Sequence, residues 1–292
     1  MRITTLSTFR DFKCKAGDCR HSCCIGWEID IDEETYKSYM AEPSEFGDRL
    51  RSSISADPCP HFVIDENDRC PFLNSSGLCD LILNLGEDRL CDICTDHPRY
   101  RNPGEIGMGL CCEEAARLIM EEKGPISIVD SGIEDDGEYE EFFFEKERKK
   151  MFDILNSAEP LEKKAQKCLD IAGAKLEEFK RDELYGFLMG LERLDPAWES
   201  YLAGMTEPQK LTPSEEKIFS NVAFYFLHRY LAQSVDEEDL SLFTAFAFRA
   251  VRIIISVFQG TKKRSEDLLD VLRMFSSEIE YSDENIDKMI IY

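Results

Sequence analysis

Basic side chains are scarce in this sequence. Its 292 residues include 35 lysines and arginines but 59 aspartates and glutamates, a formal net charge of −24. Acidic residues outnumber basic residues in both halves of the chain, so neither half is basic. Because nucleic-acid binding depends mainly on lysines and arginines that neutralise phosphates, we expect no nucleic-acid partner. A lysine-bearing protein surface is the kind of partner that this charge attracts.

The sequence also lacks an export signal and an uncharged apolar run long enough to cross a membrane. Its first residues, MRITTLSTFRDFKCKAG, contain no apolar segment followed by a small-residue cleavage site. The longest apolar region, residues 240–258, carries Arg249 and Arg252 near its centre, which favours a buried helix. We therefore expect a cytoplasmic protein with no membrane partner, in a compartment where structural disulfides are rare.

Cysteine, by contrast, is concentrated in one part of the chain. Eleven of the 12 cysteines lie between Cys14 and Cys112. Turn-forming pairs such as Cys70-Pro71 and Ser76-Gly77 interrupt this part every few residues, which predicts short elements and a small core. We predict a mainly α fold in which an irregular, loop-rich, metal-binding region (residues 1–125) precedes an α-helical bundle (residues 126–292).

Local patterns predict the elements of the second part. The segment CCEEAARLIMEEKG predicts a helix with Ala115, Leu118 and Ile119 on one face and Gly124 at its end. The acidic segment DSGIEDDGEYEE, residues 130–141, is typical of an exposed linker or a solvated helix start, and no strand is expected beyond residue 130.

Two capping boxes predict helix starts further along the chain. Thr212 is followed by Pro213 and Glu215, and Ser234 is followed by Glu237 in a helix that Gly260 would close. A stripe of large apolar residues should form the core between these helices. It consists of Phe219, Phe224, Phe226, Leu227, Phe243, Phe246, Phe248 and Phe258.

The cysteine spacing indicates a metal site. Cys91 and Cys94 form a CxxC pair, and Cys19 and Cys23 are nearly as close in sequence. Thiolates at such spacings can converge on one zinc ion or iron–sulfur cluster. A second CxxC is missing, and the histidines beside cysteines (His21, His61 and His97) have no repeating offset, so an iron–sulfur cluster is favoured and zinc remains the alternative.

Residues 10–120 resemble the flagellin lysine methylase family. The resemblance lies in the segments CKAGDCRHSCCIGWEIDIDEETY, CPFLNSSGLCDL, GEDRLCDICTDHPRY and CCEEAARLI. The amino-terminal cysteine region, including the CPFL block, is also similar to a broader group of small zinc- or iron-chelating proteins. The family resemblance implies a protein-lysine N-methyltransferase that uses S-adenosylmethionine, carries a [4Fe-4S] cluster and acts on flagellin. The metal positions that it implies are Cys14, Cys19, Cys23, Cys24, Cys70, Cys79, Cys91, Cys94, Cys111 and Cys112.

Catalytic and cofactor-binding residues stay unassigned from the sequence. Gly104, Gly107 and Gly109 precede no strand–helix unit of the kind that binds a nucleotide cofactor. Tyr36, Tyr39 and Tyr100 lie near the cysteine motifs and could accept the proton of a substrate lysine, but packing is the favoured role for each. The alternative function is a non-catalytic zinc- or iron-chelating or redox-sensing module with a helical partner-binding domain.

Overall fold

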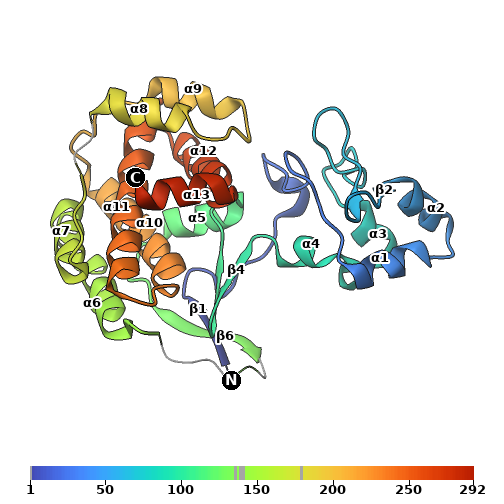
Figure 1. The fold of residues 1–292 in the computed structure, drawn as a ribbon, viewed down its shortest axis with the longest axis horizontal. Coiled ribbons are helices and arrows are strands. Elements are labelled where there is room, and N and C mark those ends of the chain that lie inside the picture. Colours follow the sequence, from blue (N-terminus) through green and yellow to red (C-terminus); the bar gives the residue numbers. More distant parts are fainter. Residues whose placement is uncertain (1, 135–136, 138–141, 178–179) are drawn as a thin grey trace. The chain divides into compact units, whose positions relative to one another are not determined.

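The chain folds into two compact units. A computed structural model describes residues 2–134, 137, 142–177 and 180–292 (Figure 1). The larger unit comprises Met1–Phe12 and Tyr100–Tyr292, and the smaller unit comprises Lys13–Arg99. The expected boundary between residues 125 and 126 therefore lies inside the larger unit. The two divisions differ because the amino-terminal strand pairs with strands that follow residue 100.

A four-stranded sheet belongs to the larger unit, in the order β4-β5-β1-β6. β1 runs parallel to β5, with Thr4 opposite Glu105, and antiparallel to β6, with Leu6 opposite Ile128. The strands are β1 (Arg2–Leu6), β4 (Arg99–Asn102), β5 (Glu105–Met108) and β6 (Ile128–Glu134).

The sequence expectation for residues 130–134 is wrong. These residues form part of the edge strand β6, whereas the sequence indicated a linker or a helix start. The strand is mostly exposed or half-buried and carries Asp130 and Glu134, so it has no apolar alternation by which it could be recognised. Its backbone pairing with β1 holds it in place. Residues 135–136 and 138–141 of the acidic segment lie outside the described residues.

Helices make up most of the larger unit, so the mainly α architecture is confirmed. Figure 1 shows α10 and α11 side by side in the middle of the surrounding helices. The α-helices of this unit are α5 (Glu113–Glu121), α6 (Glu145–Leu155), α7 (Leu161–Ala172), α8 (Arg181–Met189), α9 (Ala197–Gly204), α10 (Pro213–Leu231), α11 (Glu237–Gln259), α12 (Ser265–Phe275) and α13 (Asp283–Ile291), and a π-helical turn, η3 (Ser276–Glu280), follows α12.

The predicted helix ends are only partly correct. The Thr212 hydroxyl accepts a hydrogen bond from the Glu215 amide, and Pro213 begins α10, as the capping box predicts. Gly260 follows the last residue of α11, also as predicted. The Ser234 box is wrong, because Asp236 accepts the Asp239 amide and caps α11 instead. The helix over CCEEAARLIMEEKG is confirmed as α5, but it ends at Glu121 and not at Gly124.

The core of the larger unit is centred on α10 and α11 and also includes residues of the sheet and of the surrounding helices. The predicted apolar stripe is confirmed, with Phe243 partly buried and its other members buried. Among the described residues, α11 is the one helix long and apolar enough to cross a membrane by length and composition, and 78% of its most apolar window is buried. Arg249 lies inside this core, where it donates to the Met289 carbonyl at 2.6 Å.

Short elements and loops form the smaller unit, in line with its turn-rich sequence. Its buried apolar core consists of Ile29, Ile31, Tyr39, Leu50, Phe62, Phe72 and Leu81, together with two cysteines. The elements are η1 (Ala16–Asp18), α1 (Glu33–Met40), α2 (Glu45–Ser52), β2 (Ile54–Ser55), β3 (His61–Phe62), α3 (Asp80–Leu85), η2 (Glu87–Arg89) and α4 (Asp92–Asp96).

Gly107 of β5 provides a test of the packing in the sheet. A Cβ atom at this position would lie 2.1 Å from Cζ of Tyr100 on β4, so Gly107→Ala should lower the free energy of unfolding by about 1–3 kcal/mol. Gly186→Ala is the control, because no atom lies within 4 Å of the added Cβ on α8, and it should stabilise by about 0.5–1 kcal/mol.

Denaturant unfolding followed by Trp198 fluorescence measures both changes, since Trp198 is buried in the larger unit. The background variant Trp27→Phe removes the tryptophan of the smaller unit. Equal stability of the two glycine variants would contradict the close approach of the Tyr100 ring to β5.

Candidate functional site

Five of the predicted metal cysteines gather in the core of the smaller unit. Cys70 and Cys91 are buried members of this core, and Cys24, Cys79 and Cys94 pack against it. We call these five residues the thiol core. Backbone contacts bring their segments together: the Cys70 amide donates to the Cys24 carbonyl at 2.9 Å, and Leu73 forms a β-bridge with Cys79.

Asp32 fixes the position of the CxxC pair. Its carboxylate accepts the Thr35 amide at the start of α1 (2.8 Å) and the Asp92 amide at the start of α4 (3.0 Å). Cys91 immediately precedes α4 and Cys94 lies within it. Two short helices thus share one capping carboxylate, which holds both thiols of the pair against the core.

Hydrogen bonds within the thiol core, and one from the neighbouring Cys23, separate the pKa values of its members. The Cys23 thiol lowers the pKa of Cys24 to about 7, and the hydrogen bond between Cys91 and Cys94 lowers the pKa of Cys91 and raises that of Cys94. Burial raises the pKa of Cys70 to about 12 and also raises the pKa of Cys79. Two sulfurs of the thiol core are therefore biased toward the thiolate, the form that binds metals.

The thiol core fits iron or zinc by the type of its donors. It offers five sulfur ligands, where one zinc ion or one [4Fe-4S] cluster takes four. Within the described part of the chain, no three histidine, cysteine, aspartate or glutamate side chains are arranged to hold one metal ion. The metal-binding region thus remains a prediction, and what the structure adds is which thiols share one core.

The remaining predicted cysteines are not members of the thiol core, although the Cys23 thiol contacts Cys24. Cys14 and Cys23 are exposed and Cys19 is half-buried, all in the loop before α1, where the Trp27 indole donates to the Cys23 carbonyl at 2.7 Å. Cys111 and Cys112 belong to the larger unit. Burial raises the pKa of Cys111 to about 12, against the effect of its hydrogen bond with Tyr281.

Two of the histidines beside cysteines have structural contacts. His61 Nδ1 lies 2.8 Å from the Cys59 carbonyl oxygen. The His97 ring is 5.8 Å from that of Trp27, centroid to centroid, and desolvation lowers its pKa to about 4, so the imidazole is neutral at neutral pH. Both rings thus have contacts within the smaller unit.

A buried polar network in the larger unit was missed by sequence reasoning. Arg148 of α6 makes a bidentate ion pair with Glu105 of β5, at 3.0 and 2.6 Å. His228 of α10 lies beside this pair, with Nε2 at 3.3 Å from a Glu105 oxygen, although without hydrogen-bond geometry. The Tyr100 hydroxyl lies 2.9 Å from His228 Nδ1.

Desolvation dominates the electrostatics of this network. Burial raises the pKa of Glu105, and the Arg148 guanidinium opposes that shift. Burial also lowers the pKa of His228, with Arg148 acting in the same direction, so the imidazole is neutral. Of the three tyrosines suggested by the sequence, Tyr39 donates to the Arg89 carbonyl in the smaller-unit core, whereas Tyr100 joins a chain of titratable groups.

A second buried carboxylate, Glu280, lies next to this network. It accepts the hydroxyls of Tyr225 and Tyr230, each at 3.0 Å, and Arg229 lies 3.3 Å from it. The Tyr100 ring makes an edge contact with Tyr225, 6.0 Å between centroids. The two carboxylates are thus joined by aromatic side chains, and each has an arginine beside it.

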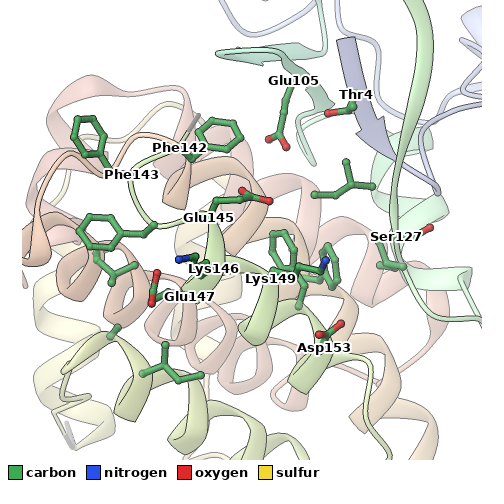
Figure 2. Close-up of a pocket in the computed structure, with 18 of the residues that line it drawn as sticks. Thr4, Glu105, Ser127, Phe142, Phe143, Glu145, Lys146, Glu147, Lys149 and Asp153 are labelled. Atoms are coloured by element: carbon green, nitrogen blue, oxygen red, sulfur yellow. The ribbon is translucent and has the colours of Figure 1, made fainter. Parts of the chain in front are cut away.

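The network reaches a pocket through Glu105. The pocket has a volume of about 1470 Å³ and lies within the larger unit, between the sheet and one face of α6. Figure 2 shows Glu105 beside Phe142 at this pocket, with Glu145, Lys149 and Asp153 along α6. The first residues of α11 and the end of α7 complete the wall.

Curated proteins with similar sequences include two named "Lysine-N-methylase". The one from Salmonella choleraesuis is 26% identical over 149 residues, which is 45% of this chain and 35% of that protein. The one from Salmonella typhimurium is 26% identical over 140 residues, 42% of this chain and 33% of that protein. "Flagellar biosynthetic protein FliU" of Salmonella muenchen is 25% identical over 143 residues, 43% of this chain and 81% of that protein.

The matches thus span about a third of the length of the two lysine-N-methylases. No family model matches the chain, and no solved structure matches it. The chain is therefore distantly similar, over somewhat less than half of its length, to proteins named for lysine methylation and flagellar biosynthesis.

Arg148→Met tests the buried ion pair through pH. The folded pKa of Glu105 already lies above its ordinary value, so ionisation of Glu105 opposes folding and stability falls as pH rises through that range. Methionine removes the charge that counters this shift. We expect a loss of about 3–5 kcal/mol near pH 8, and a smaller loss near pH 5, where Glu105 can bind a proton.

Denaturant unfolding at the two pH values measures this difference. Lys288→Met is the control, because it breaks the exposed pair with Glu284 and should cost about 0.3–0.5 kcal/mol at both pH values. A cost for Arg148→Met that does not depend on pH would show that Glu105 is not the group left unpaired.

Proposed function

We propose that this chain is an S-adenosylmethionine-dependent protein-lysine N-methyltransferase that carries a [4Fe-4S] cluster and acts on flagellin or another protein lysine. The observation that carries the proposal is the similarity to the two proteins named "Lysine-N-methylase". The name of the third relative supports a substrate connected with flagella. The net charge of −24 suits a substrate that presents lysines.

The thiol core is the part of the chain that would hold the cluster. Its five thiols lie in one core and two are biased toward the thiolate, whereas Cys111 and Cys112 belong to the other unit. A bound cluster supplies Lewis-acidic iron that can position the cofactor. Cys14, Cys19 and Cys23 are then left for structural roles or for a second metal.

Methyl transfer requires a neutral substrate amine. The lysine nitrogen must lose a proton before its lone pair can form the N–C bond while the C–S bond of the cofactor breaks. The products are methyl-lysine, S-adenosylhomocysteine and the released proton. Glu105 belongs to the buried network and lines the pocket, so its carboxylate is a candidate for receiving that proton. Burial raises the pKa of Tyr100, which keeps its phenol protonated and unsuited to this role.

Anaerobic purification followed by a methylation assay tests the proposal. The protein should contain iron and acid-labile sulfide, and it should transfer label from S-adenosylmethionine to lysines of flagellin. Iron without any transfer would support the alternative, a non-catalytic iron- or zinc-chelating or redox-sensing module. A protein that has neither iron nor transfer would refute both the cluster and the activity.

The double variant Cys91→Ser/Cys94→Ser tests the thiol core. Because both serines remove a thiolate donor, iron content should fall more than about tenfold. Cys59→Ser is the matched control, since Cys59 is an exposed cysteine of the same unit that lies outside the thiol core. It should keep the iron content and activity of the parent protein. Equal iron in the two variants would place the cluster on other cysteines.

A further inference from the structure

The pocket beside Glu105 is larger than a site for a single small molecule. Its volume of about 1470 Å³ exceeds the range of roughly 300–1,000 Å³ that is usual for small-molecule pockets. Elements from distant parts of the chain surround it, namely β1, β5, α6, the end of α7 and the start of α11. A pocket of this size can hold a segment of polypeptide.

Aromatic rings form one part of the wall. Phe142, Phe143 and Phe144 precede α6, and Phe152 and Phe224 come from α6 and α10. Phe143 is 70% exposed, which is unusual for a side chain of this size. Figure 2 shows the Phe142 ring near Glu105, with the Phe143 ring farther from the carboxylates along the same segment. Aromatic faces next to carboxylates are surroundings that attract cations.

The charges of the lining point to the same class of ligand. Six of the lining residues are acidic and three are basic. Of the basic residues, Arg2 forms an ion pair with Asp130 at 2.7 Å. The acidic residues are Glu105, Glu145, Glu147, Asp153, Asp170 and Glu237, and the basic residues are Arg2, Lys146 and Lys149.

The guanidinium group of Arg148 already lies among phenylalanine rings and carboxylates beside the pocket. The Arg148 guanidinium lies 4.6 Å from the Phe142 ring centroid and 5.0 Å from that of Phe152. It also makes its bidentate pair with Glu105 and lies 3.6 Å from Glu145. Phenylalanine rings and carboxylates at this wall therefore stabilise a buried positive charge within the protein itself.

We propose that this pocket receives a lysine-bearing segment of the protein substrate, whose ammonium group is held by the pocket carboxylates and phenylalanine rings. The assignment rests on the proposed function, since it names the place where the substrate would bind. A methylated lysine keeps its positive charge, so the same surroundings hold the product. The excess of acidic residues disfavours an anionic ligand in the same place.

Fluorescence anisotropy with a labelled peptide tests the inference. The probe carries one central lysine among neutral residues, and the control probe carries N-acetyl-lysine, which is uncharged. The pocket variant is Asp153→Asn/Glu237→Gln, because both side chains are exposed and line the pocket. Loss of two exposed charges should weaken binding of the lysine peptide about threefold to tenfold.

A matched variant separates the pocket from the general acidity of the protein. Glu162→Gln/Glu238→Gln also removes two exposed charges from helices, and Glu238 is the neighbour of Glu237, but neither residue lines the pocket. It should bind the lysine peptide as the parent protein does. Phe143→Ala should also weaken binding, whereas Ile291→Ala, at a residue 75% exposed elsewhere, should not.

The outcomes distinguish this inference from the proposed function. Equal binding of the lysine peptide by the two double variants overturns the inference, even if flagellin is methylated. Weaker binding of S-adenosylhomocysteine, instead of the peptide, by the pocket variant would also overturn it and make the pocket a cofactor site. A third outcome is that the pocket variant binds the lysine peptide more weakly than the matched variant does, while iron-loaded protein transfers no methyl group. This result overturns the proposed function and leaves the pocket as a site for lysine-bearing segments.

Discussion

The larger unit is organised around the buried ion pair between Glu105 and Arg148. Glu105 enters the unit on β5 and Arg148 on α6, and the Arg148 side chain is only 1% exposed. A desolvated pair of this kind is tolerated when its hydrogen bonds are made, because either charge left alone costs several kcal/mol. The two terminal nitrogens of Arg148 meet that condition through the bidentate bonds to Glu105, whereas the buried Nε has no hydrogen-bond partner and the Phe142 and Phe152 rings lie beside the guanidinium. The pair therefore fixes the distance between the sheet and α6, and with it the wall of the pocket.

Other contacts connect the Glu105–Arg148 pair to the rest of the larger unit. β1 runs beside β5 with Thr4 opposite Glu105, so the first strand supports the backbone that presents the carboxylate. Asn102, the last residue of β4, donates to the carbonyls of His228 and Arg229 near the end of α10. These hydrogen bonds join the sheet to the central helices. The position of Tyr100 over Gly107 then brings its hydroxyl to His228. The amino-terminal strand is thus part of the larger unit for a physical reason and not by proximity in sequence.

Local patterns revealed the helices but not the long-range pairings. The Thr212 box and the phenylalanine stripe depend on residues close in sequence, and both were predicted correctly. β6 was missed because its strand character comes from β1, which lies more than a hundred residues earlier. The same limit applies to the sites. The cysteines could be recognised by type and spacing, whereas Glu105 and Arg148 are ordinary charged residues separated by 43 positions, and their burial has no local signal.

The buried cores of the two units differ in composition. The larger unit buries long apolar helices, whereas two of the nine buried residues in the smaller-unit core are cysteines. Protonated thiols contribute little beyond their modest apolar surface, and the high pKa of Cys70 shows that the buried site disfavours its charge. A metal bound in place of those protons would stabilise the smaller unit. Its binding free energy would add to the free energy of folding, because the site forms only when the chain folds. Under the proposed function, the fold of the smaller unit and its cluster would form together, while the larger unit would keep the lysine-binding pocket in either state.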